Sequence, residues 1–120
     1  MSKKRVLHIQ VTTLAESLAR FTDTWKQAEK GKRVEPYTGV GFETMASLAV
    51  TLTPKRWELI EWLKKEGPVT IYRLAKLLER DYKNVHGDVK ILEGLGIVIR
   101  DGSRVSVPWD EIEARVRLAA

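Results

Sequence analysis

The sequence predicts an α+β fold that is mainly helical, and residues 53–107 are its most sharply patterned part. Between Thr53 and Leu95, apolar residues recur at helical spacing in three short segments, each preceded by a residue that can cap a helix. An Asp-Gly turn at residues 101–102 follows, flanked by β-branched residues as in a β-hairpin. Near the N-terminus, residues 5–11 alternate in the manner of a half-buried strand.

Composition limits the classes of protein that this chain can belong to. It has 120 residues, which fits one domain or a small domain with an extension. The absence of cysteine excludes disulfides, thiol nucleophiles and cysteine-based zinc sites, and two histidines are too few for a His-rich metal centre. No Ser/His/Asp, HExxH or phosphate-loop motif is present; Gly39-Val40-Gly41 lacks the third glycine and the Lys-Ser/Thr that follow in such a loop. We therefore expect neither an enzyme nor a bound cofactor or metal.

Charge and hydropathy point to an intracellular protein. The 21 Lys and Arg residues exceed the 16 Asp and Glu residues, so the net charge is +5, which permits nucleic-acid binding without requiring it. No apolar run approaches the roughly 20 residues of a membrane span, and no cleavage site follows the basic start. We expect a cytoplasmic protein that does not enter a membrane.

The first third of the chain predicts a strand and a helix. After the strand at residues 5–11, Thr13 and Glu16 form the capping-box pattern of a helix start. One apolar stripe then runs over four turns, at Leu14, Leu18, Phe21, Trp25 and Ala28. We predict that residues 1–41 form an extension for dimerisation or partner binding, and that residues 42–120 form the main domain.

The elements from residue 37 to residue 67 are shorter. Tyr37–Phe42 contains two glycines and predicts a short strand, and Glu43–Leu52 predicts a short helix. Thr53-Pro54 is a cap followed by proline at the first helical position. The helix that it opens buries Leu59, Ile60 and Leu63, and Gly67-Pro68 ends it.

Two further helices and a hairpin complete the pattern. Thr70 caps a helix over Ile71–Leu78, and Asp81 caps another whose apolar stripe is Val85, Val89, Leu92 and Leu95. Ile97–Arg100 and Arg104–Val107 predict the strands on either side of the Asp-Gly turn. For residues 109–120 two readings stay open, a short helix over 109–115 or a strand over 115–118.

Helix, helix, helix and hairpin in this order predict a winged helix-turn-helix with an N-terminal strand–helix extension. In such a domain the third helix buries one stripe and presents the opposite one to the major groove, whose width of about 12 Å fits a helix. The second helix and the wing contact phosphates. The predicted DNA-binding residues are Thr70, Tyr72, Arg73, Tyr82, Lys83, Asn84, His86, Gly87, Lys90, Arg100 and Arg104.

The residue types on the third helix suit base recognition. Asn84 can bond adenine through two atoms, and Lys83 and Lys90 can bind guanine. Gly87 would allow the helix backbone to approach DNA closely, at a cost of roughly 1 kcal/mol relative to alanine. Against this interpretation stands an ordinary solvated helix face. The acidic residues Glu79, Asp81, Asp88 and Glu93 weigh against DNA binding by residues 53–107 and towards a winged helix used only for protein contacts.

The run from Leu52 to Val98 resembles a family of small prokaryotic winged-helix proteins held to be transcriptional regulators, similar in plan to MarR- and ArsR-type repressors. The resemblance rests on Leu52–Arg56, on Arg80–Val89 and on Leu92-Glu93-x-Leu95-Gly96. It covers residues 42–113 and extends more weakly to the N-terminal part. Many members carry Arg where Gly87 stands, so this position departs from the family pattern, and the departure implies a weaker phosphate contact here.

The predicted function is that of a sequence-specific DNA-binding regulator, a repressor acting by operator occupancy as a homodimer on a pseudo-palindrome. The alternative is a protein-interaction module. The resemblance implies one form of it, because some relatives are antitoxins of toxin–antitoxin pairs. A toxin or another protein would then be the main partner, in place of or besides double-stranded DNA.

Overall fold

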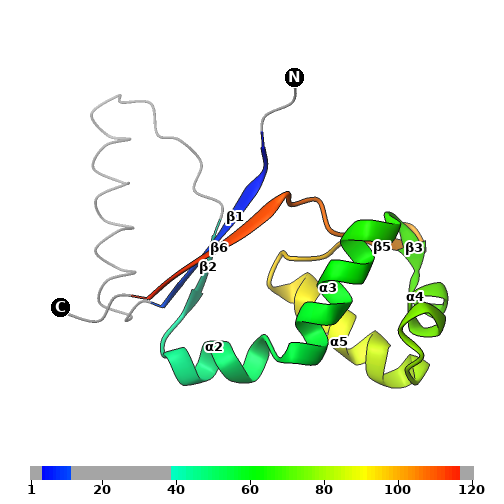
Figure 1. Cartoon of the computed structure of the whole chain (residues 1–120), viewed down its shortest axis with the longest axis horizontal. Helices are drawn as coiled ribbons and strands as arrows, with labels where there is room; N and C mark the ends of the chain where they lie inside the picture. Colours follow the sequence, from blue (N-terminus) through cyan, green and yellow to red (C-terminus); the bar gives the residue numbers. More distant parts are fainter. Residues whose placement is uncertain (1–3, 12–38, 117–120) are drawn as a thin grey trace. The chain divides into compact units, whose positions relative to one another are not determined.

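The computed structural model describes residues 4–11 and 39–116, and in this part of the chain the fold is α+β (Figure 1). These residues form two compact units. The helical unit contains Leu52–Glu111 together with Lys4 and Arg5, and the sheet unit contains residues 6–11, 39–51 and 112–116.

The helical unit contains the three helices that the sequence predicts after Thr53. They are α3 (Pro54–Glu66), α4 (Ile71–Leu78) and α5 (Tyr82–Gly94). The hydroxyl of Thr53 accepts a hydrogen bond from the Arg56 N–H at 3.3 Å, and that of Thr70 accepts one from the Arg73 N–H at 3.1 Å. Both predicted caps are therefore confirmed, since each satisfies a main-chain donor in the first helical turn.

The third cap differs from its prediction. Asp81 occupies the N-cap position of α5, but its side chain makes no capping hydrogen bond. The preceding residues already restrict the turn. Glu79 is left-handed, with φ 54° and ψ 44°, and the Arg80 N–H bonds the carbonyl of Ala75 at 3.0 Å. This connection leads from α4 into α5 without a glycine, although a left-handed residue other than glycine costs about 1 kcal/mol.

The predicted hairpin is confirmed, with shorter strands than expected. Strand β4 (Ile99–Asp101) pairs antiparallel with β5 (Arg104–Ser106), and Gly102 in the turn has a φ of 62°. A two-residue strand, β3 (Val69–Thr70), pairs with the other side of β5 and gives the sheet order β3-β5-β4. The sequence prediction missed β3, because two residues are too few for a periodic signal.

The core of the helical unit consists of the stripes that the sequence assigned to it. In α5, Val85, Val89 and Leu92 are fully buried, whereas Leu95 at the end of the same stripe is only half-buried. Side chains from the other helices and the hairpin complete this core, namely Leu59, Leu63, Leu74, Ile97, Val98 and Val105.

The sheet unit has the strand order β2-β1-β6. Strands β1 (Val6–Val11) and β2 (Gly39–Phe42) are parallel, with His8 opposite Gly39 and Val11 opposite Phe42. Leu7 and Ile9 are buried on one face of β1, as the alternating pattern predicts. The predicted short helix is present as α2 (Met45–Thr51), and the helix predicted after Thr13 lies outside the described residues.

Two expectations about the C-terminal part need correction. Residues 109–115 do not form a helix, and the strand begins earlier than residue 115, because β6 spans Glu111–Val116. Ile112, Ala114 and Val116 alternate with polar residues, so this segment has the period of a strand.

The predicted boundary after residue 41 also differs from the structure. Residues 42–51 belong to the sheet unit, and so do residues 112–116, because β6 lies beside β1.

The fragment 52–111 should fold without the rest of the chain. All the core residues of the helical unit lie within it, so we expect a cooperative thermal transition followed by far-UV circular dichroism. A chain of about 60 residues is only marginally stable, and the midpoint of its thermal transition should lie below that of the full protein. A fragment with no transition would show that the two units share one core.

In the same fragment, Leu92→Ala should lower the free energy of unfolding by about 2–5 kcal/mol, which should remove the cooperative transition.

Candidate functional site

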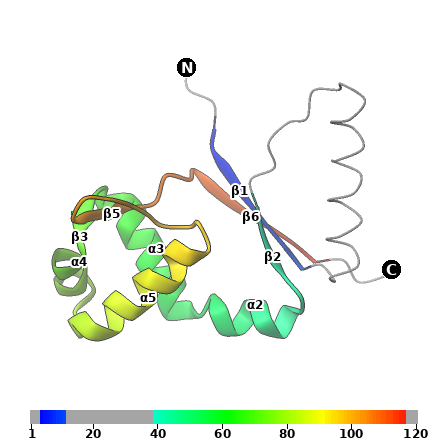
Figure 2. The same ribbon diagram turned by 180° about the vertical axis from the view of Figure 1, so that it is seen from behind.

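The outward face of α5 carries the residues that the sequence predicts for base recognition. Tyr82, Lys83, Asn84, His86, Gly87 and Lys90 are all exposed. Val85, Val89 and Leu92 on the opposite face are fully buried. The helix lies in front of α3 in the view of Figure 2. The predicted division of this helix into a buried and a free stripe is therefore confirmed.

Within this face, three residues form one line along the helix. Lys83, Gly87 and Lys90 follow at steps of four and three, so they lie above one another. The rings of Tyr82 and His86 flank this line, with centroids 5.9 Å apart and planes tilted by 36°. Asn84 lies on the other flank, one turn before Asp88. Amide, ammonium, imidazole and phenol groups thus occupy one exposed surface, which can form hydrogen bonds with base edges and phosphates.

Gly87 has open space beside it. A Cβ atom added at this position would meet no other atom within 4 Å. In the described part of the chain nothing therefore requires glycine here, although glycine costs about 1 kcal/mol in a helix. Close approach of another molecule to the backbone would account for that cost.

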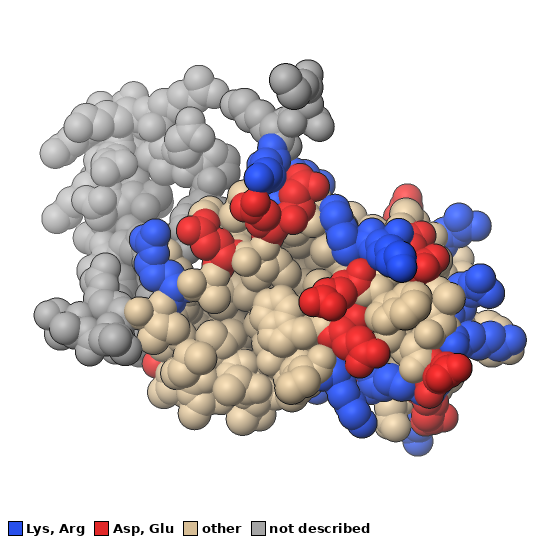
Figure 3. Space-filling view, viewed as in Figure 1, with Lys and Arg blue, Asp and Glu red and all other residues tan. Residues whose placement is uncertain are grey.

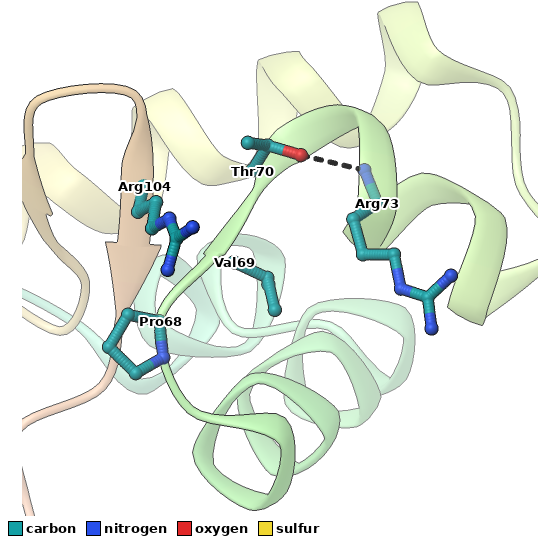
Figure 4. A pocket seen from close by; sticks show the side chains of 5 residues that line it. All are labelled: Pro68, Val69, Thr70, Arg73 and Arg104. Atoms are coloured by element: carbon teal, nitrogen blue, oxygen red, sulfur yellow. Dashed lines mark hydrogen bonds between the residues drawn. The ribbon is translucent and has the colours of Figure 1, made fainter.

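A shallow pocket of about 240 Å³ lies where α4 begins beside the hairpin (Figure 4). Thr70, Arg73 and Arg104 line it together with Pro68 and Val69. Thr70 and Arg104 are partners in the β3–β5 ladder, and the two arginines lie on either side of Val69. Tyr72, 59 % exposed, follows on α4, with the ammonium of Lys76 4.5 Å from its ring centroid. This pocket has the positive charge and the hydroxyl group that a phosphate contact needs.

Arg100 is arranged differently from its prediction as a wing contact. Its guanidinium forms two hydrogen bonds to the Glu93 carboxylate, at 2.6 and 3.3 Å. The hydrogen bond to Glu93 raises the pKa of Arg100 above its usual value. Arg100 is exposed, but its donors are directed to α5, and Arg104 is the arginine of the hairpin that lines the pocket.

The carboxylate of Asp88 joins three parts of the helical unit. One oxygen accepts a hydrogen bond from Arg56 of α3 at 3.1 Å, and the other accepts one from Arg80 of the turn before α5 at 2.7 Å. The three side chains are only 15–21 % exposed. Asp88 thus faces the interior of its own unit, and it fixes α5 against α3 and against the turn.

The ion pairs of the described residues divide the cations of the helical unit into two groups. Carboxylate partners are present for Lys4, Arg56, Lys64, Arg80 and Arg100. In the described part of the chain no ion pair is formed by Lys55, Lys65, Arg73, Lys76, Lys83, Lys90 and Arg104. Figure 3 shows Lys and Arg side chains along the right-hand rim, over the region where Figure 1 places α4, β3 and β5, with acidic residues between them.

Sequence reasoning missed the residues that hold this surface in place. Arg56 and Arg80 lie in segments that carry the family resemblance, but no pattern connects them with Asp88, which is 32 residues from Arg56 along the chain. The sequence likewise does not connect Trp109 with the residues that it contacts. Its indole N–H donates to the carbonyl of Gly96 at 2.9 Å, and the Arg5 guanidinium lies 5.2 Å from the centroid of its ring system. No cluster of metal-ligating side chains and no helix long and apolar enough to cross a membrane occurs among residues 4–11 and 39–116.

Comparison with known proteins gave one match. The model of a family described as HVO_A0114 matches residues 51–114, slightly more than half of the chain. This range contains the whole of α3, α4, α5 and the hairpin. Neither the curated proteins nor the solved structures contained a match.

Replacing Asp88 should destabilise the protein more than replacing any exposed acid of the same helix. Asp88→Ala leaves two partly buried arginines without their carboxylate, and the free energy of unfolding should fall by about 2 kcal/mol, less than for a fully buried pair. Asp81→Ala is the matched control, since Asp81 is exposed and makes no capping bond; its effect should stay below about 1 kcal/mol. Chemical denaturation measures both, and equal losses would contradict the assigned role of Asp88.

Proposed function

We propose that this chain, which belongs to the HVO_A0114 family, is a winged helix-turn-helix protein that binds double-stranded DNA. The description of the family names no activity. The observation that carries this proposal is the exposed face of α5, with Lys83, Asn84 and Lys90 around an unobstructed Gly87. In this interpretation α4 and α5 are the helix-turn-helix pair, α3 is the platform, and β4 and β5 are the wing. DNA binding makes use of a cationic face that the rest of the described chain leaves without carboxylate partners.

The proposed mechanism is operator occupancy. α5 enters the major groove, where Asn84 and Lys83 in its first turn reach base edges. Arg73 and Arg104 hold phosphates from the pocket at the start of α4, with the Thr70 hydroxyl beside them. Two copies read a pseudo-palindromic site, and occupancy of that site represses transcription. The wing acts through Arg104, because the donors of Arg100 are bound by Glu93.

A second candidate function is supported by the surface of α2. Met45 is 54 % and Val50 is 74 % exposed, and the helix contains no charged residue. An exposed apolar helix face suits a protein partner, as an antitoxin would need for its toxin. Salt separates the two functions, because DNA binding weakens steeply as counterions compete for phosphates, whereas an apolar protein contact does not.

Substitutions on α5 and beside the wing should affect DNA binding in different ways. Selection from a random DNA pool supplies the operator, and each variant is titrated with operator and scrambled DNA over a salt series. Lys83→Ala and Asn84→Ala should each cost roughly 1–3 kcal/mol on the operator and relax preference at one position. Arg73→Ala and Arg104→Ala should weaken binding to both DNAs equally and lower the salt slope by about one per lost phosphate contact.

All four positions of this series are exposed or at the pocket rim, so the thermal midpoints should stay close to that of the wild type. Lys55→Ala is a matched control, because Lys55 is an exposed cation of α3 that does not line the pocket. If Arg104→Ala abolishes the preference for operator while Asn84→Ala preserves it, α5 is not the reading helix. If no variant changes binding to any DNA, the protein-interaction function is favoured.

A substitution at Gly87 should affect stability and DNA binding in opposite directions. Gly87→Ala should raise the free energy of unfolding by about 1 kcal/mol, because alanine is the better helix former and its Cβ meets no atom of the described chain. The same methyl group should obstruct the approach of DNA and weaken operator binding about tenfold. Gly94→Ala is the matched control, since Gly94 is also exposed, in the same helix and free of neighbours within 4 Å. It should leave DNA binding unchanged, and a Gly87→Ala protein that binds like the wild type would exclude close approach at this position.

A further inference from the structure

Strand β6 is an edge of the sheet. In the order β2-β1-β6 it has β1 on one side and no other described strand on the opposite side. An edge strand presents unpaired N–H and C=O groups that can pair with another strand. Every residue of β6 except Ile112 is exposed, and Val116 is 38 % exposed.

The start of β6 is joined to the residue before β1. The Asp110 N–H and the Glu111 N–H both donate to the carbonyl of Arg5, at 2.8 and 3.2 Å. Successive residues of a regular strand direct these groups to opposite sides, so the strand is irregular at this point. The register of a further strand beside β6 is therefore inferred from the side chains of β6.

The side chains of β6 separate charge from apolar surface. The Glu113 carboxylate lies 3.5 Å from the Nδ1 atom of His8, and a pocket of about 190 Å³ is lined by His8, Ile9, Gln10, Glu113 and Arg115. Glu113 and Arg115 thus lie on the polar face of the sheet. Ile112, Ala114 and Val116 alternate with them and lie on the other face, which also contains Leu7 and Ile9.

We propose that β6 pairs antiparallel with β6 of a second copy of this chain, centred on Ala114. The two-fold axis then passes between the two Ala114 residues, and Glu113 of each copy lies opposite Arg115 of the other. On the apolar face, Ile112 lies opposite Val116. Each charge of the central segment meets its opposite, and each large apolar side chain meets another.

The charges of β6 favour a pairing register centred on Ala114 over the registers centred on neighbouring residues. A centre at Glu113 places the two Glu113 residues opposite each other, and a centre at Arg115 does the same with arginine. A centre at Ile112 places Glu111 opposite Glu113. Like charges directly opposite each other destabilise a sheet. The sequence of β6 is therefore complementary to itself in one register only, which favours a second copy as the occupant and a closed two-fold pair as the assembly.

This inference goes beyond DNA binding, and its test contains no DNA. A monomeric wild type would exclude the reading of a pseudo-palindrome by a preformed pair but would leave the proposed DNA contact of α5 untouched, so the two failures are distinguishable. The full chain is examined by sedimentation velocity between 1 and 100 µM, a range that includes typical weak dimers. The wild type should dimerise. Glu113→Lys and Arg115→Glu each convert both ion pairs into like-charge pairs, and each should weaken the dimer about tenfold or more.

Charge exchange provides the decisive result. The double variant Glu113→Lys/Arg115→Glu restores opposite charges and should dimerise again. A mixture of the two single variants should form a heterodimer more readily than either forms a homodimer. Glu61→Lys on α3 is the control for net charge and should dimerise like the wild type, because Glu61 is exposed in the other unit.

Three results would overturn the proposal. They are a wild type that stays monomeric to 100 µM, single variants that dimerise like the wild type, and a double variant that is no better than the single ones. A dimer that survives Glu113→Lys and is lost on Val50→Lys would instead assign the interface to the apolar face of α2. Circular dichroism of each variant confirms folding, and Arg115→Glu tests the same register if Glu113→Lys fails to fold.

Discussion

The carboxylate of Asp88 is the interaction on which the rest of the helical unit depends. Burial of Val85, Val89 and Leu92 attaches α5 to the core, but apolar burial has no direction and tolerates rotation of a helix about its axis. Two charge-assisted hydrogen bonds, to Arg56 and Arg80, fix that rotation because they require particular positions for both carboxylate oxygens. The rotation of α5 decides which of its side chains face outward, so Asp88 determines the composition of the candidate DNA-binding face.

The ion pairs of Asp88 and Glu93 change the charge that α5 presents to solvent. A net charge of +5 is modest, and acidic residues on the third helix argue against a nucleic-acid surface when only the sequence is considered. In the structure, Asp88 and Glu93 are paired with arginines of their own unit. Their negative charges are compensated locally, while Lys83 and Lys90 on the same helix have no such partner in the described chain. The local field of α5 is therefore more positive than the composition indicates.

Local signals predicted most of the helical unit, and distant pairings account for what they missed. Thr53 and Thr70 cap helices through residues three positions on, and the Asp-Gly turn joins adjacent strands, so the sequence contains both partners within a few residues. Asp88 pairs with an arginine 32 positions away, and β6 lies beside a strand that begins at Val6. A single sequence contains no sign of either pairing. The helix expected over residues 109–115 was wrong for this reason, and the boundary predicted after residue 41 differs from the division of the described chain into two units.

Short stretches of chain connect the two units. The chain passes from one unit to the other at residues 5–6, 51–52 and 111–112, in each case without a long linker. Near the last of these passages, the Asp110 carboxylate accepts a hydrogen bond from the Arg5 N–H at 2.8 Å, and this bond lowers the pKa of Asp110. The Lys4 ammonium forms an ion pair with the Glu111 carboxylate, also at 2.8 Å. The start of β6 is thus bound to the chain that enters β1, and Trp109 just before it is bound to Gly96. The proposed pairing through β6 and the proposed DNA contact through α5 use residues of different units, so the two surfaces share no side chains.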